Sequence, residues 1–163
     1  MTRILAVDWG TRRIGLALSD ALNLTAQPLP PILLPAGQDP AHVPVFLARA
    51  LLQLAEEHEV ARYVLGLPLE LSGERGPAAQ AVDALADALR ARTKLPVELW
   101  DERFTSALAE QSLRDQGVHG SKRKGGGRER ARTRTSEEKA RIDQRAAILL
   151  LQSWLDAHPE TRS

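Results

Sequence analysis

Two short apolar segments on either side of a glycine turn open the chain and limit its fold more than any other feature. Residues 3–7 and 14–19 consist mainly of Ile, Leu, Val and Ala, and Gly10 lies between them. Such a pair of segments joined by a tight Gly-containing turn predicts two strands of a β-hairpin. Asp8 ends the first strand, so a carboxylate is expected at the mouth of the sheet, beside the backbone N–H groups of the turn.

The rest of the chain continues with one more extended segment and then alternates strand and helix patterns. The expected strands are residues 24–34, 62–68 and 96–100, and the expected helices are residues 40–58, 77–92, 104–116 and 137–157. Three prolines limit the third strand to the edge of a sheet, because proline cannot donate a ladder hydrogen bond. This order predicts an α/β fold with a mixed five-stranded sheet, in which three antiparallel meander strands precede two parallel strands and helices flank both faces.

Length and composition predict one soluble domain over residues 1–163. The hydrophobic fraction of 43% and the charged fraction of 26% are ordinary for a globular protein. The sequence contains no cysteine, which excludes disulfides and thiolate metal sites and suits a reducing compartment. Because no apolar segment approaches membrane-spanning length, we expect a cytoplasmic protein that does not contact a membrane.

The net charge of +1 hides an uneven distribution. Residues 121–141 contain nine Lys or Arg and three Glu, so this segment carries +6 and the rest of the chain −5. Residues 118–136 show no periodicity and include three consecutive glycines, which predicts a flexible basic loop. The asymmetry indicates an anionic partner that is contacted by this segment.

Three acids stand where separate elements would bring them to one edge of the sheet. Asp8 ends the first strand, Glu102 lies just past the last strand, and Asp143 falls in the first turns of the final helix. Cleavage of a phosphodiester needs a nucleophilic water and stabilised charge on the phosphate oxygens. Two hard cations about 4 Å apart, held by several carboxylates, supply both. These acids are therefore the candidate ligands of a metal-dependent hydrolase.

Four ordered motifs make the chain resemble the YqgF/RuvX family of ribonuclease-H-like proteins, which includes Holliday-junction resolvases and pre-16S rRNA nucleases. The motifs are residues 7–20, residues 66–69 with Gly73 and Gly76-Pro77, residues 100–105 with Ala109-Glu110, and Ile142-Asp143 with Ala146-Ala147 and Leu150-Leu151. The resemblance covers essentially the whole chain and implies a ribonuclease-H-like fold. It also implies that Asp8, Glu102 and Asp143 are catalytic acids that bind Mg²⁺ or Mn²⁺, with nucleic acid as substrate. Family members have a short basic stretch before the final Asp, whereas this chain has a longer Arg-rich insertion.

Each acid also has a structural interpretation. Asp8 could cap the turn, and Asp143 could stabilise the helix start by its charge. Asp143 shares a helix face with apolar positions four and seven residues on, where a carboxylate is costly without a cation. Glu102 could form a surface ion pair, and Asp101 competes with it for the metal role. Since side chains alternate along a strand, only one of the two points into the site, and the family resemblance selects Glu102.

Nucleic-acid contacts are expected at the turn, beside the acids and in the basic loop. The candidates are Gly10, Thr11, Arg12, Arg13, Arg103, Lys122, Arg123, Lys124, Arg128, Arg130, Arg132 and Arg134. Plain turn chemistry is an equal interpretation for Gly10 and Thr11, and the arginines beside the acids could instead balance their charge. The loop could be a solvated segment, but flexible Lys and Arg suit phosphate backbones. Only Trp9 and Phe104 lie near the motifs as stacking platforms, so the sequence does not support base recognition.

The sequence therefore predicts a metal-dependent nuclease that acts on structured RNA or branched DNA. Processing of pre-16S ribosomal RNA is the first choice and resolution of four-way DNA junctions the alternative, which would favour a homodimer. A non-catalytic RNA-binding or ribosome-assembly factor is the alternative from another class. The segment around Asp8 also resembles the first phosphate loop of sugar kinases and actin-like ATPases, but those proteins clamp ATP between two such domains, and this chain has length for one.

Overall fold

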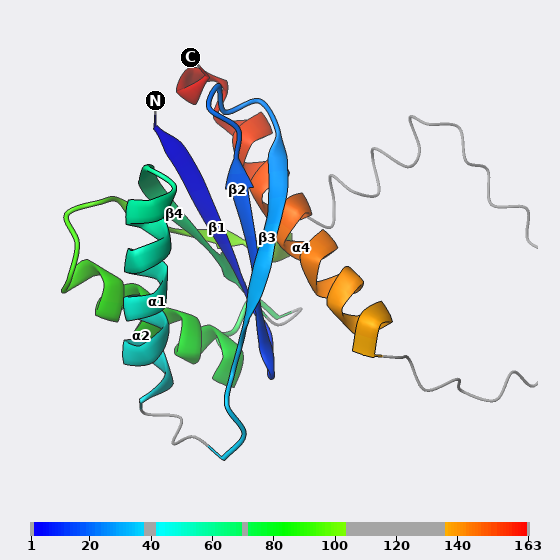
Figure 1. The fold of residues 1–163 in the computed structure, drawn as a ribbon. Helices are drawn as coiled ribbons and strands as arrows, with labels where there is room; N and C mark the ends of the chain where they lie inside the picture. The colour runs from blue at the N-terminus through cyan, green and yellow to red at the C-terminus, as the bar shows by residue number, and fades with distance from the viewer. Residues whose placement is uncertain (1, 38–41, 70–71, 104–135, 163) are drawn as a thin grey trace, which may run out of the picture.

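The computed structural model describes residues 2–37, 42–69, 72–103 and 136–162, with the backbone alone for several residues at the start of the last helix, Asp143 among them. The strands are β1 (Arg3–Trp9), β2 (Arg13–Ser19), β3 (Ala26–Leu33), β4 (Val60–Leu67) and β5 (Val97–Asp101). The helices are α1 (Val43–Glu57), α2 (Pro77–Arg90), α4 (Ser136–Ala157) and the 3₁₀ helix η1 (Pro159–Thr161), as Figure 1 shows. The helix expected over residues 104–116 lies outside the described residues.

The strands form one sheet in the order β3-β2-β1-β4-β5. β1 pairs antiparallel with β2, and β2 with β3, whereas β1 with β4 and β4 with β5 are parallel pairs. The expected mixed sheet, a meander followed by two parallel strands, is confirmed. Because β1, β4 and β5 run in the same direction, their carboxyl ends meet at one edge of the sheet, where the hairpin between β1 and β2 also turns.

The first strand is longer than the sequence predicts, and this matters for the acid it carries. Asp8 pairs with Gly15 and Trp9 with Ile14, so the ladder continues two residues past Val7. The pairing of β1 with β2 continues to the hairpin turn, so Asp8 is a strand residue paired with Gly15. Its orientation is therefore fixed by the alternation of the strand.

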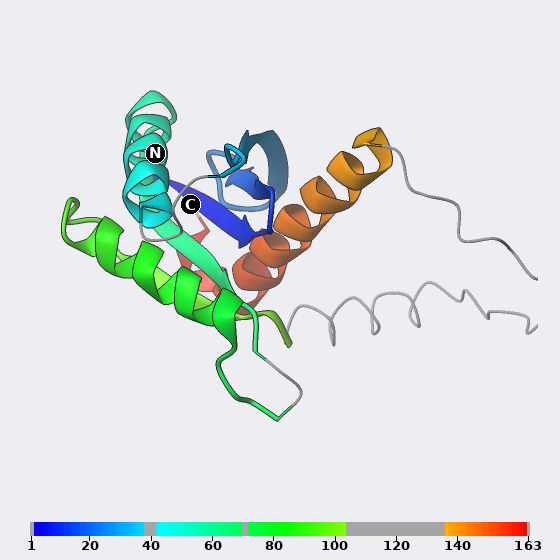
Figure 2. The same cartoon turned by 90° about the horizontal axis from the view of Figure 1, so that it is seen from below.

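Helices cover both faces of the sheet and create two separate cores. α1 and α2 lie on one face and α4 on the other, as the two views in Figures 1 and 2 show. In β1, Leu5 and Val7 pack in the core beneath α1 and α2, whereas Ile4 and Ala6 pack against α4. This strict alternation, in a strand buried on both faces, explains why the segment reads as a continuous apolar stretch.

The edge strand β3 accommodates its prolines as expected. Pro28 lies opposite Ala17 of β2, and the other side of β3 has no strand partner in the sheet. Proline is tolerated there because its missing N–H costs no ladder bond on the open side. α4 packs across β1, β2 and β3 and so covers this edge of the sheet from one face.

A small buried polar cluster ties the two ends of the described chain together. The Ser19 hydroxyl accepts a hydrogen bond from the N–H of Ile4 at 2.9 Å and donates to Asn23 Oδ1 at 2.6 Å. The Asn23 amide donates to the carbonyls of Thr2 and Thr161, at 3.1 and 2.9 Å. Among the described helices, none is long and apolar enough to cross a membrane.

Candidate active site

Asp8 faces α4. The residues two and four positions before it, Ala6 and Ile4, are buried in the core beneath that helix, and side chains alternate along a strand. Trp9, the next residue, packs with the core beneath α1 and α2 on the opposite face. Asp8 is half-buried, at the carboxyl end of β1. The carboxylate of Asp8 therefore points toward α4, at the end of the sheet where β1 ends.

Glu102 lies on the same side, over Gly66. A Cβ atom built on Gly66 would stand 2.7 Å from Glu102 Oε1 and 3.1 Å from Cδ2 of Leu150, a core residue of α4. The first distance is shorter than a real Cβ contact and the second is tight, so any larger residue at this position would displace the Glu102 carboxylate or the Leu150 side chain. The carboxylate of Glu102 thus occupies space that Gly66 leaves open between β4 and α4.

Asp8 lies on the strand next to this space. Val7 pairs with Leu65, so Asp8 and Gly66 each follow one residue on, in adjacent parallel strands about 4.8 Å apart. The Glu102 carboxylate reaches over Gly66 from the next strand, β5. Two of the three predicted acids therefore lie on the face that α4 covers, Asp8 near the end of β1 and Glu102 just past β5, with Gly66 of β4 between them.

Asp101 belongs to a different interaction. Its carboxylate accepts hydrogen bonds from the Arg103 backbone N–H at 2.9 Å, from Nε at 3.0 and 3.1 Å and from Nη2 at 2.7 Å. These side-chain hydrogen bonds hold the pKa of Asp101 below its ordinary value and raise the pKa of Arg103. The ion pair that the sequence leaves open for Glu102 is thus formed by Asp101, which leaves Glu102 to the α4 face.

The Asp101–Arg103 pair brackets Glu102 and constrains its backbone. The bond from the Arg103 N–H to Asp101 Oδ1 closes a tight turn directly after β5. The guanidinium lies near the loop before α2, where Nη1 is 3.6 Å from a Cβ built on Gly73. Arg103 remains half-exposed, with a side-chain exposure of 50%. We interpret the pair as the support that fixes the direction of Glu102.

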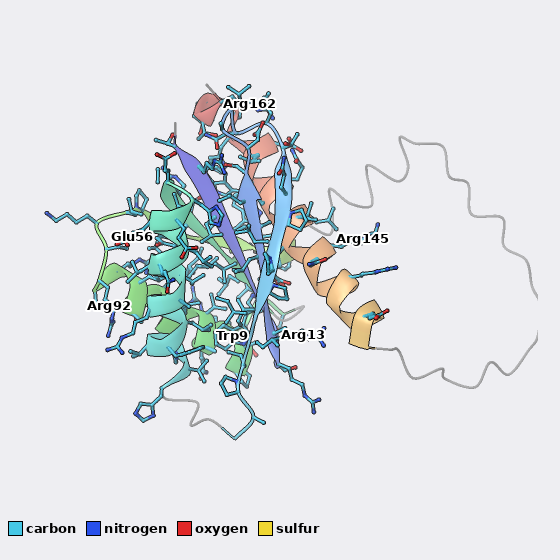
Figure 3. The ribbon with its side chains drawn as sticks, in the orientation of Figure 1. Trp9, Arg13, Glu56, Arg92, Arg145 and Arg162 are labelled. Atoms are coloured by element: carbon cyan, nitrogen blue, oxygen red, sulfur yellow. The ribbon has the colours of Figure 1, made fainter. Side chains whose placement is uncertain are left out.

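The hairpin turn beside Asp8 is tightly folded. A Cβ atom on Gly10 would collide with the carbonyl oxygen of Arg13, so the turn requires glycine there. Thr11 and Arg12 are exposed, and the carbonyl of Arg12 accepts a hydrogen bond from the Leu34 N–H at 2.9 Å. Arg13 begins β2 on the α4 face, and Figure 3 shows it at the same end of the sheet as Trp9.

Asp143 occupies an early turn of α4, in the backbone position that the sequence predicts. Ala147 and Leu150, four and seven residues on, are buried against the sheet, so position 143 belongs to the same face of the helix. Figure 1 shows that α4 starts toward the end of the sheet where β1 ends, and Figure 2 shows that its first turns extend beyond the sheet. The side chain of Asp143 lies outside the described part of the structure, so the role of Asp143 as the third acid stays a prediction.

Comparison with known proteins places the chain in a family. The RuvX family, described as Holliday junction resolvase, matches residues 2–157. The chain belongs to the RuvX family. A relative from Chloroflexus aurantiacus, named "Putative pre-16S rRNA nuclease", is 43% identical over 154 residues, which are 94% of this chain and 86% of the relative. A relative of the same name from Myxococcus xanthus is 40% identical and covers 98% of this chain and 92% of its own.

Solved structures confirm the fold of this RuvX-family chain. Thermus thermophilus RuvC in complex with a Holliday junction substrate has a TM-score of 0.55 at 19% identity and covers 100% of this chain and 99% of its own. The yeast mitochondrial Holliday junction resolvase Ydc2 has a TM-score of 0.54 at 15% identity, with coverages of 98% and 80%. At these identities the likeness concerns the fold, and the expected ribonuclease-H-like fold is confirmed.

The acids of this RuvX-family site fit a hard divalent cation. Ionised carboxylates are the oxygen donors that Mg²⁺ and Mn²⁺ prefer, and the space over Gly66 lets two of them approach. Among residues with described side chains, no group of three or more His, Cys, Asp or Glu gathers. A complete ligand set therefore depends on Asp143. The basic-loop candidates Lys122, Arg123, Lys124, Arg128, Arg130, Arg132 and Arg134 lie outside the described residues.

Gly66 is the site residue whose role the sequence analysis missed. Gly66 belongs to one of the four motifs, and its position inside an otherwise apolar strand is itself a signal. An isolated glycine within a strand often marks a place where another group approaches the backbone closely. Here the approaching group is the carboxylate of Glu102.

Proposed function

We propose that this chain is a metal-dependent nuclease that hydrolyses phosphodiester bonds in structured nucleic acid. The observation that carries the proposal is the Glu102 carboxylate seated over Gly66, beside Asp8 and beneath α4. Two acids far apart in sequence lie on one face of the sheet, at the end where the parallel strands of a ribonuclease-H-like fold expose their carboxyl ends. Membership of the RuvX family supports the same reading.

Asp8, Glu102 and Asp143 would hold Mg²⁺ or Mn²⁺, which when bound supplies Lewis-acid stabilisation of phosphate charge and an activated water. The chain's own contribution is to fix the acids. Pairing with Gly15 orients Asp8, and the Asp101–Arg103 pair orients Glu102. Arg13 on the same face, and the exposed Thr11 and Arg12 of the turn, stand where they would contact the phosphates on either side of the scissile bond.

We propose pre-16S ribosomal RNA as the substrate, because relatives up to 43% identical carry that substrate in their names. The second candidate is the four-way DNA junction, which the description of the matching family favours. A homodimer would suit that substrate, since two symmetric cuts need two sites. The proposed location is the cytoplasm, where ribosomal RNA precursors of bacteria are processed.

A cleavage assay separates these substrates. The protein is incubated with Mg²⁺ or Mn²⁺ and a precursor 16S rRNA, a single-stranded RNA or a four-way DNA junction, with a chelator as control. We expect metal-dependent cleavage of the precursor within its flanking sequence and slower cleavage of the junction. Preferential cutting of the junction would select the second candidate. Binding of RNA without cleavage of any substrate would overturn the nuclease proposal in favour of a non-catalytic RNA-binding factor.

A further inference from the structure

A large cavity opens on the face of the sheet opposite the acids, at the same end. It has a volume of about 870 Å³ and is lined by Trp9, Thr11 and Arg12 of the hairpin, Val43 and Pro44 of α1, and Gln80 of α2, among others. Sites for small organic ligands usually measure about 300–1,000 Å³ and combine apolar walls with a few polar groups. This cavity has the size and composition of such a site.

The cavity and the acids are separated by the thickness of one strand. Asp8 and Trp9 are consecutive residues of β1 and point to opposite faces of the sheet. Figure 3 shows Trp9 on the side of α1 and α2, at the end of the sheet where the hairpin turns. If the phosphate of a nucleic-acid strand lies at Asp8 and the strand rounds the turn at Gly10 and Thr11, a neighbouring nucleotide would lie at the cavity.

The chemistry of the lining selects a nucleobase. Trp9 offers a flat aromatic surface for stacking, and Val43 and Pro44 supply apolar walls. Gln80 brings an amide whose donors and acceptor can bond to the edge of a base, while Thr11 and Arg12 at the cavity mouth stay with the phosphates. No acidic residue is found among the described lining residues, so nothing there repels a phosphate at the cavity mouth.

From these observations we infer that the cavity receives one unpaired base of the nucleic-acid substrate, next to the bond that is cut. The inference rests on the proposed nuclease function and deepens it, because it gives the enzyme a preference for strands with an accessible base beside the scissile phosphate. A continuous duplex would have to release a base to fill the cavity, whereas single-stranded flanks and branch points offer one at little cost.

The test measures binding of the full chain to short single-stranded oligonucleotides in a chelator-containing buffer, where the strands stay intact. Oligothymidylate and oligodeoxyadenylate are compared with an abasic oligomer of equal length and charge. We expect base-bearing strands to bind about 5- to 150-fold more tightly, the range for stacking of one base on an aromatic side chain. Ala81→Leu fills the cavity and should abolish that ratio, because Ala81 lines it.

Ala78→Leu is the matched control, since it adds the same group on an exposed position of the same helix away from the cavity, and it should keep the wild-type ratio. Trp9→Leu, which removes the ring and keeps apolar volume, should lower the ratio as Ala81→Leu does. An unchanged ratio in both cavity variants would overturn the inference. Free AMP or TMP binding as tightly as the oligomers, and lost in Ala81→Leu, would also overturn it in favour of a mononucleotide site.

The outcome is distinguishable from that of the proposed function. Base preference without metal-dependent cleavage would leave the cavity standing and remove the nuclease proposal. Cleavage of the precursor without base preference would support the nuclease proposal and overturn the inference about the cavity. The two readouts use different buffers and different variants, so each can fail alone.

Discussion

The Glu102 carboxylate lies directly over Gly66, with Oε1 2.7 Å from the place where a Cβ atom on Gly66 would stand, so it keeps this position only while residue 66 has no side chain. Leu150 of α4 closes the same space from above, at 3.1 Å. The buried strand β4 thus lacks a side chain at the place where the carboxylate of Glu102, just past β5, lies over it. This arrangement places the acid beside Asp8 and explains why a glycine interrupts an otherwise apolar strand.

Gly66→Ala should therefore impair the site more than the fold. The added methyl group forces Glu102 or Leu150 to move, which we expect to cost about 1–3 kcal/mol of stability. A displacement of the acid by about 1 Å lowers the rate of a positioned reaction by about a hundredfold. Metal affinity from isothermal calorimetry, cleavage rate and thermal unfolding measure the three effects.

A second substitution tests whether the collision is the cause. Glu102→Asp shortens the acid by one methylene, so in the Gly66→Ala background it should restore part of the metal affinity. The same Glu102→Asp change alone, in the presence of Gly66, should weaken metal binding. If the double variant binds metal no better than Gly66→Ala, the contact does not position Glu102.

Asp101 should titrate below an ordinary aspartate, because Arg103 donates both side-chain and backbone hydrogen bonds to its carboxylate. A lowered pKa means that the pair stabilises the fold at pH values above about 4 and that this contribution is lost as the pH falls through the lowered pKa. Carbon-detected NMR of the carboxyl group measures this pKa directly. Arg103→Gln should return it toward the ordinary value, and an unchanged pKa would contradict the pairing.

Tyr63 offers a clean titration, because it is the only tyrosine in the sequence. Burial, with a smaller contribution from the negative charge of Glu56, raises its pKa to about 12. The folded phenol thus holds its proton more tightly than the unfolded one, whose pKa is about 10, so stability should fall as the pH rises from 10 to 12. Phenolate absorbance should show ionisation near pH 12 in the native protein and near 10 in denaturant. Ionisation near pH 10 in the folded protein would show that Tyr63 is not buried.

The polar cluster around Asn23 should contribute strongly to stability. Asn23 is 2% exposed, and Asn23→Ala removes the donors to Thr2 and Thr161 and the acceptor for Ser19. Buried groups left unpaired predict a loss of about 2–4 kcal/mol in the free energy of unfolding. Because Asn23 has a φ of 55°, Asn23→Gly should lose about 1 kcal/mol less than the alanine variant. Equal losses in denaturant unfolding would show that the backbone conformation contributes nothing.

Much of the fold could be predicted from the sequence because its signals are local. The glycine turn between two apolar segments predicts the hairpin, and the prolines of β3 predict an edge strand. Strand ends were harder to predict. Asp8 and Trp9 lie inside β1 because pairing with β2 continues to the turn, and a polar residue followed by an aromatic one gives no sign of that in the sequence.

The site could be predicted only in part, because its details depend on packing between distant segments. Alternation shows that Asp101 and Glu102 point to different places, but which one enters the site depends on the face that α4 covers. Trp100 identifies that face, because it packs against α4 and its Nε1 donates a hydrogen bond to the Ser153 hydroxyl at 3.3 Å. Glu102, two residues on, therefore points to the same side. The cavity beside Trp9 likewise joins segments that are far apart in the chain, so base recognition could not be predicted from the sequence.

The most direct test of the central claim is the cleavage rate of Asp8→Asn on precursor 16S rRNA with saturating Mg²⁺ or Mn²⁺. The substitution keeps the shape of the side chain and removes the charge that would hold the cation. We predict that cleavage falls to background while RNA binding and thermal unfolding stay near the wild-type values. Cleavage by Asp8→Asn at the wild-type rate would contradict the account, because the acid at the end of β1 would then have no part in the chemistry.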